Sequence, residues 1–282
     1  MIVPGSSAQS LAARLAAETG RQLATPTFDR FPDGETCAAV PDFAGDTAVI
    51  VAATTSNDAL VQLIQLQDAV REAGATDVTT VLSYMGYARQ DRAFTEGQPV
   101  SARAVARAVS TGTDRVVLVD PHEPTVAEFY DAATTTVSAG RRLAEPLGEL
   151  TEPVFLAPDE GAVSLAERVR DAYGRGTTDY FRKERDYDTG DVQVDPGDTS
   201  VTGRDVVVVD DIVATGSTMS EAVAALRDRD PGRIVTCCVH PMLVGNARTK
   251  LAAAGVDRVI GTDTVECASS TVSVAPVIAD VL

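Results

Sequence analysis

The residues whose types and order suggest chemistry most clearly lie between Val206 and Thr218. Four consecutive valines, typical of a buried strand, lead to the adjacent acids Asp210 and Asp211. A turn of small residues follows and opens a helical pattern. Free backbone N–H groups at such a helix start attract phosphate, because the positive end of the helix dipole lies there. The turn consists of Ala214, Thr215, Gly216, Ser217 and Thr218.

Asp210 and Asp211 suit the sugar of a phosphorylated pentose. Their carboxylates can accept hydrogen bonds from two vicinal hydroxyls, about one sugar ring away from a bound phosphate. Paired acids in front of a helix also serve as N-caps on a solvated surface, and this alternative stays open for the acids taken alone. Between the valine strand and the small-residue turn, they favour a sugar-phosphate site.

Two segments in the first third of the chain suit a nucleotide. Residues 30–35 combine an aromatic ring with acids in a Pro-Asp-Gly sequence, which by itself is equally an ordinary turn. Residues 87–92 contain two arginines, whose guanidinium forks match phosphate oxygens. A surface cluster of ion pairs is the alternative for the second segment.

The remaining candidate functional residues are a histidine and a cluster of basic residues. His122 follows an expected strand, at the end where open α/β sheets bind ligands, although a lone histidine is more often structural. Residues 181–185 include Lys183, whose compact ammonium can approach phosphoryl oxygens closely; a solvated basic patch is the alternative. This cluster lies within residues 175–203, which are polar and lack periodicity, so we expect a long loop that acts as a lid or is disordered.

Alternating strand and helix patterns position these residues. The alternation predicts an α/β fold with mostly parallel sheets flanked by helices on both faces. Expected strands cover residues 47–52, 78–82, 115–119, 154–156, 205–209, 234–239 and 256–260, and expected helices cover 57–73, 100–110, 162–172, 218–227 and 246–254.

A weak internal repeat of strand, polar loop and helix relates the segment around Val49 to the segment around Val207. It predicts two similar domains, residues 1–145 and 146–282, joined by a linker that contains proline and glycine. The end of the chain can pack on the first domain.

Composition limits the classes of function. The chain has 282 residues, 44% of them hydrophobic, and a net charge of −17, so it can form two cores but lacks the basic surface that nucleic acids or anionic membranes require. It shows no bilayer-spanning run and no signal-peptide pattern, and its four cysteines lack metal spacing. We therefore expect a cytoplasmic protein with reduced cysteines.

Arginine greatly outnumbers lysine among the basic residues. Two of the 24 are lysines, Lys183 and Lys250, and the other 22 are arginines, against 41 acidic residues. This balance resembles proteins of salt-loving cells, in which a carboxylate-rich surface stays hydrated. An acidic protein of an ordinary cell is the alternative.

The stretch from Val206 to Thr218 resembles the phosphoribosyl pyrophosphate (PRPP) motif of type I phosphoribosyltransferases. Ala214 and Ser217 depart from that pattern, where an acid and a glycine are common, but backbone amides make the contacts. The candidate segments together, in this order and over nearly the whole chain, resemble ribose-phosphate pyrophosphokinase. The resemblance implies transfer of the β,γ-pyrophosphoryl group of ATP to the 1-hydroxyl of ribose 5-phosphate.

The resemblance also implies roles for individual residues. Lys183 and Arg185 would be catalytic, and His122 and Asp159 would bind Mg²⁺. The implied ATP-binding residues are Phe31, Asp33, Gly34, Glu35, Arg89, Gln90 and Asp91. The implied ribose 5-phosphate residues are Arg185, Asp210, Asp211, Ala214, Thr215, Gly216, Ser217 and Thr218. Departures from the family pattern at Thr125 and residues 128–130 leave the finer details of the contact with the second domain open.

Two other functions compete with this one. A phosphoribosyltransferase would use residues 210–218 but would leave residues 30–35 and 87–92 unexplained. A noncatalytic regulatory relative is expected to lack loop or metal residues, whereas Lys183, Arg185, His122 and Asp159 are all present. The family's adenine loop reaches into a neighbouring subunit, so the resemblance implies a homo-oligomer, a dimer or larger.

Overall fold

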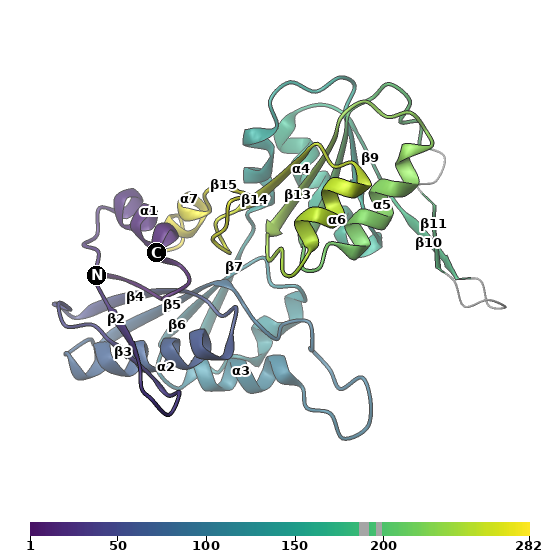
Figure 1. Cartoon of the computed structure of the whole chain (residues 1–282). Coiled ribbons are helices and arrows are strands. Elements are labelled where there is room, and N and C mark those ends of the chain that lie inside the picture. Colours follow the sequence, from purple (N-terminus) through teal and green to yellow (C-terminus); the bar gives the residue numbers. More distant parts are fainter. Residues whose placement is uncertain (186–191, 196–198) are drawn as a thin grey trace. The chain divides into compact units, whose positions relative to one another are not determined.

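The computed structural model describes residues 1–185, 192–195 and 199–282, which form two compact units (Figure 1). The first unit consists of Met1–Ser138, Asp263–Glu266 and Ser273–Leu282, and the second of Ala139–Thr262 and Cys267–Val272. The C-terminal part of the chain thus contributes to both units. Each unit has its own hydrophobic core.

The first unit is built on a five-stranded sheet in the order β1-β4-β5-β6-β7. All neighbouring strands in it are parallel, so their carboxyl ends share one edge, the edge at which such sheets bind ligands. The strands are β1 (Ile2–Pro4), β4 (Thr47–Ala53), β5 (Asp77–Tyr84), β6 (Arg115–Val119) and β7 (Ala133–Val137).

Helices cover both faces of this sheet (Figure 1). Along β4, Ile50 and Ala52 belong to one core with buried side chains of α2 and α3, whereas Val49 and Val51 are fully buried on the opposite face. On that second face α1 contacts β1 and β4 and packs against α7. The helices are α1 (Gln9–Thr19), α2 (Asn57–Glu72), α3 (Ser101–Ser110), α7 (Ala275–Ala279) and the 3₁₀ helix η1 (Pro124–Phe129).

The second unit repeats this plan with a six-stranded sheet in the order β15-β14-β13-β12-β8-β9. Its neighbouring strands are also parallel. The four valines of β12 are fully buried, as expected for a central strand covered on both faces. The strands are β8 (Val154–Ala157), β9 (Thr177–Tyr180), β12 (Val206–Ile212), β13 (Ile234–His240), β14 (Arg258–Thr262) and β15 (Ser270–Val272).

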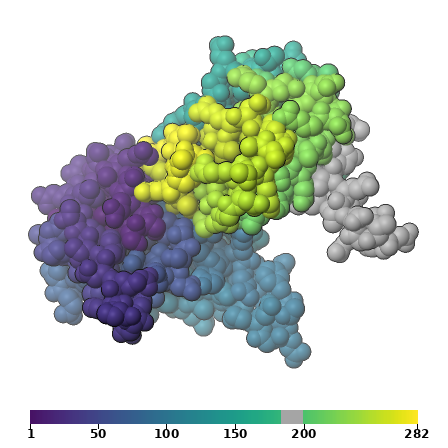
Figure 2. Space-filling view, viewed as in Figure 1, coloured from purple at the N-terminus to yellow at the C-terminus, as the bar shows by residue number. Residues whose placement is uncertain are grey.

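Helices α5 and α6 pack together and contribute to one core of the second unit, and Figure 2 shows their surfaces next to each other in green and yellow-green. Helix α4 contacts β8, β9 and β12. The helices are α4 (Val163–Tyr173), α5 (Ser217–Arg227), α6 (Ala247–Ala254) and the 3₁₀ helices η2 (Gly140–Leu147) and η3 (Glu160–Ala162).

The predicted α/β architecture is confirmed. All seven expected strands and all five expected helices occur, with bounds that differ by a few residues at most. None of the described helices is long and apolar enough to span a bilayer.

The expectation of a long loop over residues 175–203 is wrong for the part that the structure describes. Strand β9 extends the second sheet beside β8, and β10 (Arg182–Arg185) pairs antiparallel with β11 (Val192–Asp195). An edge strand and an isolated hairpin are held by backbone hydrogen bonds, so their sequences need no apolar periodicity. Residues 186–191 and 196–198 lie outside the described residues.

A second hairpin, of β2 (Thr27–Arg30) and β3 (Thr36–Ala39), belongs to the first unit. Gln65 of α2 fixes it, because its side-chain oxygen accepts from the Ala38 N–H at 3.0 Å and its amide donates to the Thr36 carbonyl at 2.8 Å. The hairpin turn, residues 31–35, is thereby tied to α2.

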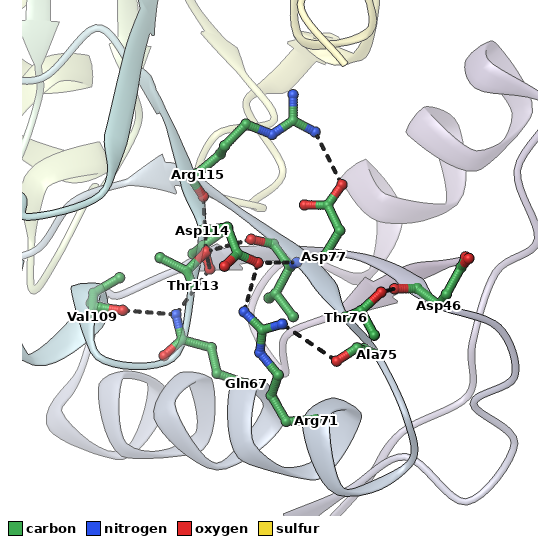
Figure 3. A network of polar contacts seen from close by, with 12 residues as sticks. Asp46, Gln67, Arg71, Ala75, Thr76, Asp77, Val109, Thr113, Asp114 and Arg115 are labelled. Atoms are coloured by element: carbon green, nitrogen blue, oxygen red, sulfur yellow. Dashed lines mark hydrogen bonds and ion pairs between the residues drawn. The ribbon is translucent and has the colours of Figure 1, made fainter.

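One aspartate in each unit joins strands at the edge opposite the carboxyl ends. Asp114, just before β6, accepts from the Val78 N–H at 2.7 Å and from Arg71 of α2 at 2.6 Å (Figure 3). Asp205, just before β12, accepts from the Thr151 N–H at 2.8 Å and from Arg233 at 2.6 Å. These contacts fix the strands whose other ends carry the candidate residues.

Candidate active site

The two candidate nucleotide loops of the first unit meet at the start of α2. Arg30, which precedes the hairpin turn, forms an ion pair with Asp58. The Tyr87 hydroxyl, in the loop after β5, donates to the Asn57 side-chain oxygen at 2.5 Å. Asn57 and Asp58 are the first two residues of α2. The structure therefore brings residues 31–35 and 87–91 to one helix end, a link that the sequence did not predict.

The turn over residues 31–35 is held by its own hydrogen bonds. The Phe31 N–H donates to the Glu35 carbonyl at 2.8 Å, and the Arg30 guanidinium donates to the Gly34 carbonyl at 2.8 Å. Asp33 accepts from the Glu35 N–H at 3.1 Å, and Gly34 has a φ of 95°, which favours glycine. Phe31 is 49% exposed, so its ring can stack on a base.

The loop after β5 approaches β4 closely. A Cβ atom on Gly86 would lie 2.2 Å from the Thr54 carbonyl oxygen, so only glycine fits there. The Gly86 N–H donates to the Thr54 hydroxyl at 2.8 Å. Tyr87 follows with a φ of 65°, a left-handed conformation that costs energy for a tyrosine and is commonly found at functional sites.

The candidate ATP residues of this loop differ in exposure. Arg89 is exposed, and Gln90 and Asp91 are half-buried. Gln90 joins the loop to the start of α3, because its side-chain oxygen accepts from the Ser101 hydroxyl at 2.5 Å and its carbonyl accepts from the Ala102 N–H at 3.1 Å. These contacts hold Gln90 in place, and the exposed Arg89 guanidinium is accessible to an anion. The ATP-binding roles of Arg89, Gln90 and Asp91 stay predictions.

His122 lies at the same edge of the first sheet, after β6, the neighbour of β5. Its side chain is exposed. Asp120, two residues earlier, has a φ of 34° and donates its N–H to the Val137 carbonyl of β7 at 3.0 Å. The chain thus turns sharply as it leaves β6, as it does after β5.

In the second unit, three acids lie at or just after the carboxyl ends of the neighbouring strands β8 and β12. Asp210 and Asp211 are the acids of β12, and Asp159 follows the neighbouring β8. Burial raises the pKa of Asp210 well above its usual value, and the negative charges of Asp211 and Asp159 raise it further. Neighbouring carboxylates repel one another when ionised, so this group suits a cation or hydroxyl donors.

The small-residue turn directly follows these acids and opens α5. Gly216 has a φ of 73°, and the Thr215 and Ser217 hydroxyls are 3.3 Å apart. The N-cap position of α5 has no side-chain hydrogen bond, so the first N–H groups of the helix have no side-chain acceptor there and suit a phosphate.

The two candidate catalytic residues are described only by their backbone. Lys183 pairs with Val194, and Arg185 pairs with Val192, in the β10–β11 hairpin. Their side chains, and residues 186–191 and 196–198 between and after these strands, lie outside the described part of the chain. The roles of Lys183 and Arg185 stay predictions.

Two parallel sheets flanked by helices, with the candidate residues at their carboxyl edges and a small-residue turn that opens α5, define a protein of the phosphoribosyltransferase class. Residues 129–273 match the family model of the phosphoribosyl transferase domain, and residues 1–112 match the N-terminal domain of ribose phosphate pyrophosphokinase. The chain belongs to the ribose-phosphate pyrophosphokinase family.

Relatives support this over full length. The chain is 59% identical over 284 residues to a ribose-phosphate pyrophosphokinase of Halobacterium salinarum, with 100% of both chains covered. It is 42% identical to one of Methanopyrus kandleri, with 99% of this chain and 97% of the relative covered. The fold is similar to phosphoribosylpyrophosphate synthetase from Mycobacterium smegmatis, with a TM-score of 0.85, 27% identity, and 100% and 96% coverage.

Membership of this family decides between the predicted functions. The protein is an enzyme, a ribose-phosphate pyrophosphokinase, which transfers a pyrophosphoryl group from ATP to ribose 5-phosphate. A simple phosphoribosyltransferase and a noncatalytic regulatory relative are not favoured, because the match includes the N-terminal domain of the pyrophosphokinase and full-length enzymes.

Proposed function

We propose that residues 210–218 bind ribose 5-phosphate. The buried strand β12 presents Asp210 and Asp211 to the two vicinal ribose hydroxyls, and the free N–H groups of residues 214–218 receive the 5-phosphate. This proposal rests on one observation: Asp210 and Asp211 lie directly before the turn that opens α5, a helix whose N-cap position makes no side-chain hydrogen bond. Carboxylates accept hydrogen bonds from hydroxyls and repel phosphates, so they orient the sugar in one direction.

We propose that the first unit binds ATP through its two loops at the start of α2. Phe31 stacks on the adenine ring, Asp33 and Glu35 accept from amino or hydroxyl groups, and Arg89 contacts the phosphates. The half-exposed ring of Phe31 and the contacts of Arg30 and Tyr87 with neighbouring residues of α2 support this arrangement.

The residues present fit a magnesium ion, which we propose as the cofactor. Among the described residues no three acidic, histidine or cysteine side chains form a metal cluster, but Mg²⁺ is commonly held by one or two carboxylates, water and substrate phosphates. Asp159, whose charge already acts on Asp210, supplies a carboxylate, and by family resemblance His122 helps. The ion would neutralise charge on the ATP phosphates.

The reaction needs alignment and charge neutralisation. The ribose 1-hydroxyl oxygen attacks the β-phosphorus of ATP and gives up its proton to water. A new O–P bond forms, and the bond from the β-phosphorus to the α-phosphate oxygen breaks as AMP leaves. Positioning and positive charge supply most of the acceleration in phosphoryl transfer. We propose that Lys183 and Arg185 supply that charge, as the family resemblance implies.

Replacing Lys183 tests this assignment. Lys183→Ala is expected to lower kcat by about 10³-fold or more, the usual contribution of a positioned cation, while the KM values for ATP and ribose 5-phosphate change little. Release of AMP, followed with pure protein, ATP, Mg²⁺ and ribose 5-phosphate, measures it. Arg182→Ala removes the same charge one residue earlier on β10 and serves as the control. Near-normal kcat in Lys183→Ala would exclude Lys183 from the mechanism.

We also propose that the enzyme works as a homo-oligomer, as the family resemblance implies. Light scattering of the pure protein in assay buffer tests this, and a monomer with full activity would contradict it. The cytoplasmic location stays a prediction.

A further inference from the structure

Lys250, which the sequence did not single out for a role in the site, contacts the small-residue turn. Its Nζ donates to the Ser217 hydroxyl at 3.0 Å. Ser217 is the first residue of α5, at the positive end of the helix, where an ammonium gains nothing from the helix dipole. A cation at this position is therefore better explained by an anion that binds there.

The position of Lys250 is fixed by close packing between the turn and α6. The Leu243 and Val244 N–H groups donate to the Val213 and Ala214 carbonyls at 2.9 and 3.0 Å. A Cβ on Gly216 would lie 3.3 Å from the carbonyl oxygen of Ala247, the first residue of α6.

Lys250 is three residues after Ala247, and residues three apart share one face of a helix. Helices α5 and α6 lie side by side (Figure 2), so this face of α6 is directed to the turn.

The ammonium of Lys250 also has capacity left for a ligand. In the part of the chain that the structure describes, Lys250 forms no ion pair with a carboxylate, although the chain has 41 acidic residues. An ammonium has three donors, and Ser217 takes one of them. Two N–H groups remain for phosphate oxygens, and the side chain is half-buried.

We infer that Lys250 is a phosphate-binding residue of this enzyme, which pairs with the 5-phosphate of ribose 5-phosphate while Ser217 holds its ammonium beside the start of α5. This inference rests on the proposed sugar-phosphate site at residues 210–218. It also gives Ser217, where the family motif commonly has glycine, a function of its own. The arrangement adds a full positive charge to a site otherwise made of backbone N–H groups and hydroxyls.

Lys250→Met tests the inference, since it keeps the length of the side chain and removes the charge. The KM for ribose 5-phosphate, and its dissociation constant from calorimetry without ATP, are expected to rise about 10- to 100-fold, the effect of losing a hydrogen bond to a charged group. The values of kcat and of the KM for ATP are expected to change by less than about threefold. Lys250→Arg should recover most of the affinity.

Arg248→Met is the matched control. Arg248 lies on the same helix and carries the same charge, but it donates to the Ser269 hydroxyl at 3.0 Å. Its loss should leave the affinity for ribose 5-phosphate unchanged. Raising KCl should weaken ribose 5-phosphate binding more in the wild type than in Lys250→Met, a difference that a purely structural lysine would not produce.

Asp210→Asn separates failure of this inference from failure of the site. If Asp210→Asn weakens ribose 5-phosphate binding and Lys250→Met does not, Lys250 has no role in binding and the site stands. If neither variant changes the affinity, the proposed site is wrong as well. A lower melting temperature for Lys250→Met, with ATP and ribose 5-phosphate affected equally, would make Lys250 structural.

Discussion

Asp210, which we propose to bind the ribose hydroxyls, is expected to lower the stability of the folded protein. Its carboxylate is half-buried, and burial, together with the negative charges of Asp211 and Asp159, raises its pKa well above the usual value. An acid with a raised pKa in the folded state opposes folding as it ionises, because the unfolded chain then binds fewer protons. Hydroxyl groups or a cation from the substrates would offset this cost.

Asp210→Asn is therefore expected to raise the melting temperature of the substrate-free enzyme by a few degrees at pH 7. The gain should shrink as the pH falls and vanish below about 4, the ordinary value for aspartate, because there the carboxyl of the wild type is protonated in both states. The same variant should lower kcat/KM for ribose 5-phosphate about 10- to 100-fold, as a charged hydrogen-bond acceptor is lost.

Calorimetry over a range of pH and the AMP-release assay measure these two effects. Asp228→Asn, an exposed acid at the other end of α5, is the control and should show neither. A melting temperature lowered by Asp210→Asn would contradict the claim that the ionised Asp210 carboxylate destabilises the folded protein.

At the scale of elements, each sheet is held at its amino edge by one aspartate, and the opposite edge is left for ligands. Asp205 accepts hydrogen bonds from the chain before β8 and from the residue before β13, Arg233. Burial alone would raise the pKa of Asp205, but the Arg233 guanidinium and the N–H groups of Thr151 and Arg233 lower it below its usual value. In the first unit, burial alone would likewise raise the pKa of Asp114, but the Val78 N–H and the Arg71 guanidinium lower it.

Asp205→Ala is expected to cost about 2–3 kcal/mol of unfolding free energy, as a buried carboxylate with charged partners is removed. A lowered pKa in the folded state stabilises the protein above the unfolded value of about 3.9. The stabilisation is then lost as the pH falls through the lower folded value. The difference in unfolding free energy between the wild type and Asp205→Ala should thus be constant near pH 7 and shrink below about pH 4.

Urea unfolding of both proteins at several pH values measures this difference. The exposed Glu221→Gln on α5 is the control and should change the unfolding free energy little. A difference that grew on acidification would contradict the role given to Asp205.

At the scale of the whole molecule, the property with the largest expected effect on stability is the negative net charge. The net charge of −17 in 282 residues favours expanded states through self-repulsion. With two lysines among 24 basic residues, positive charge is carried almost entirely by guanidinium groups, which pair with carboxylates in a defined geometry. The Halobacterium salinarum relative at 59% identity agrees with the interpretation of the composition as salt-adapted.

The melting temperature is therefore expected to rise by at least about 5 °C, or about 2 kcal/mol, between 0.1 M and 1 M KCl. The screening length falls from about 10 Å to about 3 Å over this range, which reduces repulsion between surface carboxylates. Differential scanning calorimetry measures the shift, and sucrose of equal osmolarity is the control. An unchanged or lower melting temperature in 1 M KCl would contradict the prediction.

The sequence predicted those elements whose signal is local. The strands and helices flanking residues 210–218 follow from a valine run and from apolar residues spaced for a helix. Helix α1 was not predicted, since its N-cap, Ala8, has no capping side chain. Its first N–H groups instead donate to Glu266, at 2.6 Å from Ser10 and 3.0 Å from Leu11. Strands β9 to β11 were missed because they are polar.

By itself, the sequence determined the α/β class, the family and the identity of the chemical groups, because these depend on residue types and on spacings along the chain. Only the tertiary structure brought Asp159 within electrostatic reach of Asp210, joined both candidate nucleotide loops to Asn57 and Asp58, and placed the Lys250 ammonium against the Ser217 hydroxyl. The members of each pair lie far apart along the chain. Whether they come together depends on which strands are neighbours and on how the helices pack, and no local pattern of residues encodes that.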